Sequence, residues 1–467
     1  MSTDRSRQLG EGSITRLLAE FSIPAIVGLL AQALYLIVDR IFIGWALKSP
    51  GIAGITVCFP LMLVIMGFSL LIGLGAAALI SIRLGEQRKA EAELVLGNAA
   101  TLTVIASVVL TAVGLLLLDR SLVLVGASQD VLPYAHDYMQ IIVLGTICQI
   151  VGYGLNAPIR GEGNPRVAML TLLIGVLLNA ILAPIFIFAF GWGMRGAGLA
   201  TILSQGVSAV WVAAYFLRGD SLLRIRWKNL RLKKSVCLEI MAIGSSPFAI
   251  QIAAAVMQSI LNCQLDRYGG DEAIAAWGII WAVIMMFFMP IFGINQGSQP
   301  IMGYNYGAGE YARVKEALRT AIAVATAIAV LGFAVMMLGT VPVVRLFNPG
   351  DAELQTMTVR AMRICVIMMP LVGFQVVSAG YFIAVGKPRE SMLVSLSRQL
   401  LFLIPAVLVL PSFFGLTGVW AALPTADLSS SLLSAVLLWF EWRHLGRGSR
   451  GCAEENPAGG QRESASK

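Results

Sequence analysis

The chain has 467 residues, of which 57% are hydrophobic and 13% are charged, and its mean hydropathy is +0.80. This composition leaves too little polar surface for a water-soluble protein of this length. The formal net charge of +8 comes largely from basic segments between apolar runs, which argues against nucleic-acid binding. We therefore expect a polytopic membrane protein.

Apolar runs long enough to cross a hydrocarbon core of ~30 Å recur along the chain. They lie at about 17–44, 54–82, 94–118, 132–157, 167–190, 196–217, 237–265, 273–301, 316–339, 354–384, 391–413 and 418–442. This pattern predicts an all-α fold with about twelve transmembrane helices.

The two halves of the chain repeat one another at a spacing of 222 to 223 residues. The matching positions are Pro24 and Pro247, Gly85 and Gly307, Pro165 and Pro388, and Gly193 and Gly415. Because each half holds an even number of spans, the second half enters the membrane on the same side as the first, so the repeats are parallel. This arrangement indicates a transporter with a central cleft between two six-helix lobes.

Basic residues predict the orientation. If the amino terminus is cytoplasmic, about 25 of the 34 Lys and Arg residues fall in cytoplasmic segments. Both termini are therefore expected on the cytoplasmic side of the cytoplasmic (inner) membrane, and we expect a monomer. The expected segments are an amino-terminal segment 1–16, a lobe 17–217, a basic linker 218–236, a second lobe 237–442 and a disordered tail 443–467.

Asp39 is the first intramembrane charge, and it follows the uncharged run 21–38. A carboxylate near the bilayer centre costs ~2.5–3.5 kcal/mol, so it indicates function. Gln32 shares its helix face, and Tyr35 lies one turn earlier. Pairing with Arg40 is the structural alternative, but consecutive helical residues diverge by about 100°. Desolvation favours the neutral acid, so Asp39 is predicted to load and release a proton.

Asn179 in the fifth span and Thr201 in the sixth fall at the depth of Asp39 when counted by helix rise. A single Asn or Thr in a span is more typical of a contact between helices. The shared depth nevertheless predicts that these side chains meet Asp39 inside the first lobe.

The second half offers amides in place of a carboxylate. Gln251, Gln258 and Asn262 share one face of the seventh helix, and Asn262 occupies the repeat position of Asp39, since 262 − 39 = 223. Coupling chemistry is therefore expected in the first lobe alone. The residues expected to line the cleft are Gln32, Tyr35, Gln251, Gln258, Asn262, Asn295 and Gln299.

Two further features of the second half leave alternatives open. The Gly- and Pro-rich segment 293–300, which holds Asn295 and Gln299, either lines a cavity or packs closely against another helix. Arg398 and Asp427 are neighbours in an antiparallel helix pair, although the Arg side chain must bridge an axial offset of roughly 9 Å. They form either a structural ion pair or part of the transport path.

Signatures of soluble enzymes are missing from the sequence. No Gly-rich loop ending in Lys-Ser or Lys-Thr occurs, so ATP hydrolysis is not expected. With only two histidines, His136 and His444, a histidine-based metal site has little to build on. We expect no enzymatic activity, no metal and no cofactor.

Four motifs resemble those of the multidrug and toxic compound extrusion family, and within it the MepA-like bacterial branch. They are Asp39–Gly44, Gly303–Gly309, Ser397–Gln399 and Pro424–Asp427, and the resemblance extends over roughly 14–442. It implies export of lipophilic cationic compounds in exchange for protons or sodium ions through a cleft between two lobes. It also implies that Asp39, Asn179 and Thr201 form the proton or cation site of the first lobe.

The chain departs from this family at one position of that site. Ala183, before Pro184, stands where relatives often carry a second Asp. A hard cation prefers several oxygen ligands, anionic ones most of all, so this difference favours protons over sodium. A Met- and Phe-rich run at 285–289 is expected to contribute an adaptable lining for drugs. The alternative function is a flippase for lipid-linked saccharides or another amphiphile, which we expect to carry a more cationic cleft.

Overall fold

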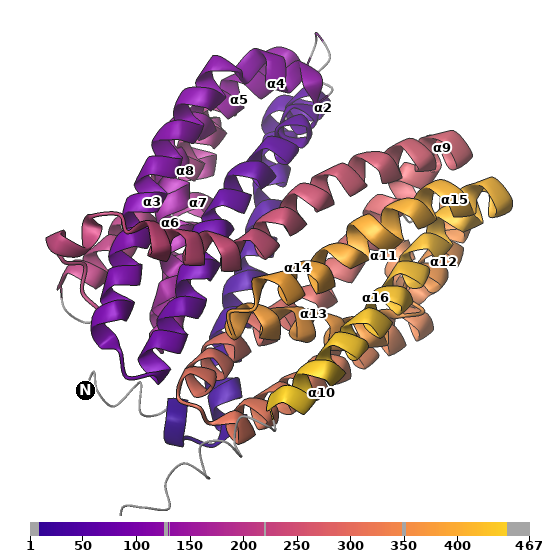
Figure 1. Cartoon of the computed structure of the whole chain (residues 1–467). Coiled ribbons are helices and arrows are strands. Elements are labelled where there is room, and N and C mark those ends of the chain that lie inside the picture. The colour runs from indigo at the N-terminus through magenta and orange to yellow at the C-terminus, as the bar shows by residue number, and fades with distance from the viewer. Residues whose placement is uncertain (1–8, 126–128, 130, 219–220, 348–351, 446–467) are drawn as a thin grey trace, which may run out of the picture.

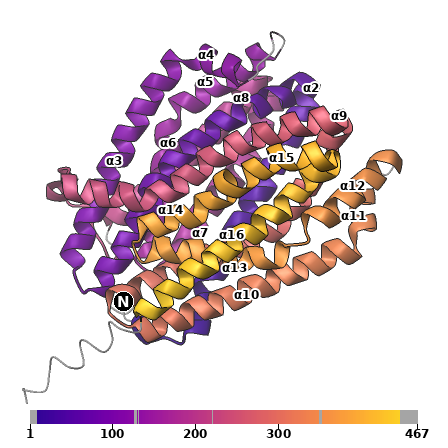
Figure 2. The same ribbon diagram turned by 45° about the vertical axis from the view of Figure 1, so that its right-hand side comes forward.

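The computed structural model describes residues 9–125, 129, 131–218, 221–347 and 352–445, and the regular elements in these ranges are helices (Figure 1; Figure 2). The first half holds α2 (Ile14–Gly85), α3 (Lys89–Leu116), α4 (Leu118–Leu124), α5 (Leu132–Leu144), α6 (Thr146–Gly161), α7 (Pro165–Pro184), η1 (Ile185–Ala189), α8 (Gly193–Arg218) and η2 (Trp227–Leu230). The second half holds α9 (Lys234–Gly307), α10 (Tyr311–Leu338), α11 (Thr340–Phe347), α12 (Ala352–Cys365), α13 (Met369–Ala384), α14 (Pro388–Leu396), η3 (Ser397–Leu403), α15 (Ile404–Phe414) and α16 (Leu416–Leu445).

The membrane spans confirm the predicted all-α class. Within the described residues, ten helices are long and apolar enough to cross a membrane, and two bent helix pairs raise the number to as many as twelve. Both long helices contain two spans, Ile14–Leu34 and Val57–Gly85 in α2, and Lys234–Gly270 and Glu272–Gly307 in α9. In α9 the division falls at Gly270, whose φ of 60° is open to glycine at little cost. The predicted tail lies outside the described residues from 446 onward.

The fourth and tenth predicted spans, at 132–157 and 354–384, are each formed by two helices that meet at an angle. α5 and α6 meet at an angle of 56°, and α12 and α13 meet at 51°. Pro370 lies in the first turn of α13, where its missing N–H and fixed φ suit a helix start but not the continuation of α12. These bends are absent from a hydropathy pattern because they change direction and not polarity.

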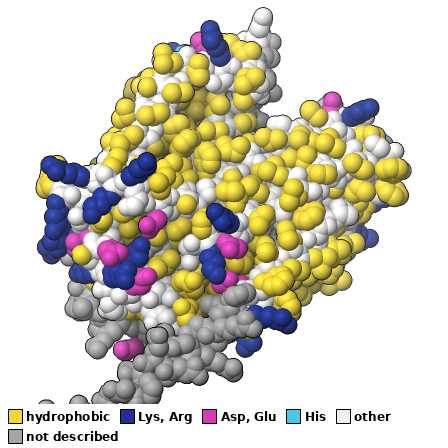
Figure 3. All heavy atoms as spheres, in the orientation of Figure 1, with side chains coloured by type: hydrophobic (Ala, Val, Ile, Leu, Met, Phe, Trp, Pro, Cys, Tyr) yellow, Lys and Arg dark blue, Asp and Glu magenta, His cyan; other side chains and the backbone are white. Residues whose placement is uncertain are grey.

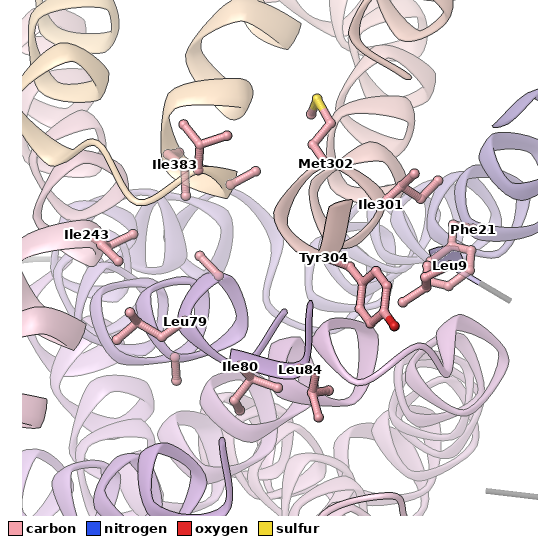
Figure 4. Close-up of a cluster of buried hydrophobic side chains, with 14 of the residues drawn as sticks. Leu9, Phe21, Leu79, Ile80, Leu84, Ile243, Ile301, Met302, Tyr304 and Ile383 are labelled. Carbon is pink, nitrogen blue, oxygen red and sulfur yellow. The ribbon is translucent and has the colours of Figure 1, made fainter. Parts of the chain in front are cut away.

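The buried hydrophobic side chains form three clusters, one shared by the two lobes and one inside each lobe. We call the end that holds the shared cluster the closed end. One cluster draws on both halves and lies near Leu9; Figure 4 shows part of it, including Leu79, Tyr304 and Ile383. A second cluster takes its buried residues only from the range 43–200, and a third only from 257–426. The lobes therefore share a core at the end near Leu9 and have cores of their own beyond it.

Backbone contacts between α2 and α9 seal this closed end. A Cβ added at Gly244 would lie 1.7 Å from the carbonyl oxygen of Leu71, and one at Gly75 would lie 2.1 Å from that of Ile240. Glycine is required at both positions because any side chain would push the helices apart. The Arg83 guanidinium on α2 also lies 3.3 Å from the Glu239 carboxylate on α9.

Away from the closed end, the two lobes diverge. The ribbons of α2 to α8 and of α9 to α16 separate toward the end opposite residue 9 (Figure 1), and the space-filling view is notched between the lobes there (Figure 3). The same view shows apolar side chains covering the flanks of both lobes. This is the surface expected of helices that face lipid.

Candidate functional site

A small cavity inside the first lobe brings together several of the predicted site residues. Gln32 of α2, Asn179 of α7 and Thr201 of α8 all line it. Asn179 and Thr201 are each only 3% exposed. The Asn179 Nδ2 donates to Thr201 Oγ1 at 3.3 Å, and this hydroxyl donates to the Ala197 carbonyl at 3.0 Å.

Helical spacing explains why this wall is polar. Thr171, Gly175 and Asn179 recur every four residues on α7, and therefore share a face. On α8, Ser208 lies seven residues after Thr201 on the facing side and donates to the Thr171 carbonyl at 3.2 Å. Gly175 permits this approach, since an added Cβ would lie 2.8 Å from the Ser208 hydroxyl. The two helices thus close around polar groups without leaving them unpaired.

The cavity is the size of a few water molecules. Its volume is about 40 Å³, and one water needs roughly 10–15 Å³ measured in this way. Drug-sized ligands occupy pockets of about 300–1,000 Å³. In this conformation the cavity therefore suits a proton carried by water or a small cation, and not a drug-sized ligand.

The predicted coupling carboxylate has a backbone position on α2 but no described side chain. The side chains of Tyr35 and Asp39 lie outside the described residues, although α2 continues through both positions. Gln32, seven residues before Asp39, donates from Nε2 to Tyr153 Oη at 2.9 Å on the cavity wall. Among the side chains that line the described cavity, there is no carboxylate. Ala183 is 1% exposed and belongs to the apolar cluster of the first lobe.

Two further cavities extend from this one toward the closed end. A cavity of about 60 Å³ shares Gln32 and Tyr153 with the first, and continues to Arg160 on α6 and Gln296 on α9. A smaller one beside it is lined by Arg160, Gln296 and Gln299. Because α6 and α9 belong to different lobes, these cavities lie at the contact between the lobes.

Arg160 is a site residue that the sequence analysis missed. Its Nη1 donates to the Asn156 side chain at 2.7 Å, and no carboxylate of the described residues pairs with it. The predicted fourth span ended at 157, so Arg160 was counted with the cytoplasmic connectors. The long side chain reaches back into the membrane region from the last turn of α6. Because a proline such as Pro158, which lies inside α6, typically interrupts a helix, no sequence signal extended the fourth span to Arg160.

The remaining cleft candidates do not gather in one place. Gln258 donates from Nε2 to Asn262 Oδ1 at 3.0 Å along α9, and neither lines the first-lobe cavity. Asn295 lies against α13, where a Cβ at Gly380 would fall 1.7 Å from its Oδ1. Gln299 lies with Arg160 instead. Gln251 lies at the contact between the lobes, where its Cβ is 3.7 Å from a Cβ added at Gly67 on α2. The six predicted residues whose side chains are described thus divide among the first lobe, the contact between the lobes and the second lobe.

The segment 293–300 both packs closely against another helix and lines a cavity, the two alternatives that its sequence left open. Its glycines pack closely, since a Cβ at Gly293 would lie 2.4 Å from the Ile26 side chain and one at Gly297 would lie 2.5 Å from Ser22 Oγ. Gln296 and Gln299, between and after them, line the cavities between the lobes. The small residues therefore let α9 touch α2 while the amides face water-sized spaces.

The Met- and Phe-rich run at 285–289 does not form a single lining. Phe288 is buried in the core of the second lobe, and Met285 and Phe287 pack against that core. Met286 is 66% exposed. Consecutive residues of a helix point in different directions, so one run cannot face one cleft.

Arg398 and Asp427 are in direct contact. Arg398 Nε donates to Asp427 Oδ1 at 2.6 Å between η3 and α16, and the carboxylate side chain is only 6% exposed. Arg398 lies in a π-helical segment, whose wider turn changes the register that a regular α-helix predicts. The ion pair joins two elements of the second lobe and does not touch the cavities described above.

Among the described residues, no group of three or more His, Cys, Asp or Glu side chains could hold a metal ion. The polar residues of the first-lobe cavity are amides and hydroxyls, with Tyr153 and Cys148 beside them. Such a set can orient water and relay a proton, but it supplies little negative charge for a bound cation.

Comparison with known proteins matches most of the chain to one family. The MatE family model matches residues 24–185 and again 247–408, so the two matches are offset by 247 − 24 = 223 residues, as in the sequence repeat. The multidrug export protein MepA of Staphylococcus haemolyticus is 27% identical over 429 residues, which are 92% of this chain and 94% of that protein. MepA of Staphylococcus aureus strain N315 is 27% identical over 427 residues, which are 91% and 93%.

Solved structures agree with this grouping. A structure of the MATE multidrug transporter DinF-BH is 40% identical, with a TM-score of 0.88, and the match covers 93% of this chain and 97% of that one. A crystal structure of a MATE protein in complex with MaL6 has a TM-score of 0.89 at 24% identity, covering 95% and 99%. The latter likeness concerns the fold alone.

Proposed function

This chain belongs to the MatE family and is a multidrug efflux transporter of the membrane, and we propose that it exports lipophilic cations in exchange for protons. Proton coupling is proposed because of the first-lobe cavity, where the side chains of Asn179 and Thr201 are hydrogen-bonded. The volume of this cavity is about 40 Å³. A space of this size holds water and a proton carrier but no drug. Asp39, on the helix face that holds Gln32, is proposed as the carrier.

Proton coupling is favoured over sodium by the donor set. The described cavity wall offers neutral amide and hydroxyl oxygens, and Ala183 packs among apolar side chains where a second carboxylate would be needed. A single carboxylate with neutral neighbours is suited to titrate, whereas a sodium ion prefers more oxygen ligands and more negative charge. The proposed site residues are therefore Asp39, Asn179 and Thr201.

We propose that alternating access proceeds by separation of the two lobes at the closed end, where α2 and α9 are in contact. We propose that both termini are cytoplasmic, so that the end with the shared core around Leu9 would face the cytoplasm and the notch between the lobes would face outward. Each lobe has its own core beyond the contact. The lobes are thus able to rock about the α2–α9 contact with their interiors intact.

An anionic amphiphile is the second candidate substrate, and Arg160 is the observation in its favour. The guanidinium lines the cavities between the lobes with no paired carboxylate among the described residues. These cavities are too small for a saccharide head group in this conformation, so lipophilic cations remain the leading proposal.

Counterflow in vesicles tests the proposal. The purified chain is reconstituted with a pH-sensitive dye inside, and a cationic or an anionic xanthene dye of similar size is added. We expect proton movement only with the cationic dye, abolished when the pH gradient is dissipated and unchanged when choline replaces sodium. Equal transport of the two dyes would contradict the substrate class, and rescue by sodium alone would contradict the coupling ion.

A further inference from the structure

An open basic groove lies at the surface where the two lobes are joined. It is formed by the start of α3 and by the segment 226–233, which carries η2 and leads into α9. Its volume is about 750 Å³, and its charged lining residues are Lys89, Glu91, Glu93, Arg226, Lys228 and Lys233. None of these residues takes part in the site proposed above.

The charge in this groove is unbalanced. Glu93 is paired with Arg226 at 2.9 Å, and Glu91 with Arg83 at 3.3 Å. Within the described part of the chain, no carboxylate lies at ion-pair distance from Lys89, Lys228 or Lys233. Three ammonium groups therefore line the groove with no carboxylate partner among the described residues. Figure 3 shows Lys and Arg side chains gathered on this side of the molecule.

Hydrogen bonds to α3 hold the segment in place. The Asn98 amide donates to the Asn229 carbonyl at 3.2 Å, and the Thr101 hydroxyl donates to the Leu230 carbonyl at 2.9 Å. The Lys233 backbone N–H donates to Asn98 Oδ1 at 2.7 Å. The lysines are thus presented by a fixed backbone, so less ordering is required when a ligand binds.

Trp227 identifies the environment of the groove. Its side chain is 90% exposed, although the neighbouring backbone is anchored. The segment follows α8 and precedes the span Lys234–Gly270, and α3 starts a span at Lys89, so the groove lies at the level of the membrane surface. Trp is enriched at that level, where its ring reaches apolar chains and its N–H stays among polar groups.

We propose that this groove binds the phosphate of an anionic phospholipid, with Trp227 inserted beside the lipid at the boundary between head group and acyl chain. Lys89, Lys228 and Lys233 supply the charge, since each Lys near an anionic membrane surface attracts the lipid. The lipid holds the segment that joins the lobes, at the end where α2 and α9 close. The proposal concerns a different part of the molecule from the coupling site and does not depend on it.

Lipid titration followed by native mass spectrometry tests the site. The full chain in neutral detergent is titrated with phosphatidylglycerol, and in parallel with phosphatidylcholine and with glycerol phosphate. The test variant is Lys89→Gln/Lys228→Gln/Lys233→Gln. The control is Arg224→Gln/Arg231→Gln/Lys234→Gln, which removes the same charge from exposed positions outside the groove lining.

We expect the groove variant to raise the apparent Kd for phosphatidylglycerol at least tenfold, and the control variant to raise it less than threefold, because three close contacts are worth up to about 100-fold. Trp227→Ala should raise the apparent Kd for phosphatidylglycerol and leave the apparent Kd for glycerol phosphate unchanged. Equal losses in both triple variants, equal binding of phosphatidylcholine, or equally tight binding of glycerol phosphate would each overturn the proposal. Cooperative thermal unfolding of each variant checks that it is folded.

Discussion

Asn179 and Thr201 lie 22 residues apart in the sequence, and a hydrogen bond of 3.3 Å joins their buried side chains across α7 and α8. The bond fixes the orientation of the Asn179 amide on the wall of the first-lobe cavity. Because the Thr201 hydroxyl also donates to the Ala197 carbonyl, it can accept from Asn179 without losing its own partner. The arrangement is suited to hold water at one position beside Gln32 of α2, which lines the same cavity.

Removing this hydroxyl should impair coupling. Thr201→Val leaves an amide hydrogen of Asn179 without its acceptor, which costs about 1–3 kcal/mol in a buried site. We expect at least a tenfold loss of proton-driven efflux, measured as dye counterflow in vesicles. Thr201→Ser keeps the hydroxyl and is the control. Its rate of proton-driven efflux should stay within about twofold of that of the original chain. Equal rates in the Val and Ser variants would remove the hydroxyl from the mechanism.

Neutralising the proposed carrier should abolish efflux altogether. Asp39→Asn keeps the shape of the side chain but removes the group that titrates. We expect the variant to fold normally, judged by its thermal midpoint in detergent. Cells that express it should show no resistance to cationic dyes. Asp119→Asn, at an exposed carboxylate paired with His136, is the control and should retain efflux. Full efflux by the Asp39→Asn variant would assign coupling to another residue.

Position 183 should decide which ion is used. Ala183→Asp places a second carboxylate one helical turn after Asn179, and a second anionic ligand favours a hard cation. We expect sodium to stimulate efflux in this variant and to have no effect on the original chain, measured in vesicles at fixed pH. Ala183→Asn has a similar volume without the charge and should gain no sodium dependence. Sodium stimulation of the original chain would contradict proton coupling.

The sequence predicted the large features of this fold for simple physical reasons. An apolar run must match the bilayer thickness, so its length gives the spans, and the offset between Pro24 and Pro247 gives the repeat. The bends at the fourth and tenth spans change direction without changing polarity, and so were missed. Arg160 was missed because a long side chain reaches several ångströms beyond its own turn.

The candidate site was partly accessible to the same reasoning. Helix rise placed Asn179 and Thr201 at one depth, and they do meet. The cleft residues were harder, because the side of α9 that faces the other lobe depends on how the lobes pack. Asn295 contacts α13 and Gln299 lies near Arg160, although the two residues are only about one helical turn apart on α9.

Breaking the ion pair of the second lobe should destabilise the protein. Asp427→Ala leaves the Arg398 guanidinium, bonded at 2.6 Å to a nearly buried carboxylate, without its partner. We expect a loss of about 2–4 kcal/mol, since Arg398 is partly exposed and recovers some solvation. Arg398→Met/Asp427→Leu should restore most of the lost free energy of unfolding, because an apolar pair can often replace a buried ion pair without loss of stability. Thermal midpoints measure stability, and vesicle efflux by the double variant separates a structural role from a transport role.

The backbone contact between the lobes should be sensitive to a single methyl group. Gly244→Ala would place a Cβ 1.7 Å from the Leu71 carbonyl oxygen, so α2 and α9 must move apart at the closed end. Gly278→Ala, on the same helix with no neighbouring atom within 4 Å, is the matched control. Alanine favours an isolated helix over glycine by about 1 kcal/mol, so helix propensity predicts stabilisation in both. We expect spin labels at exposed positions 89 and 389 to report a longer distance in the Gly244→Ala variant alone, together with loss of efflux. The same distance distribution in both variants would show that this contact does not limit closure of the lobes.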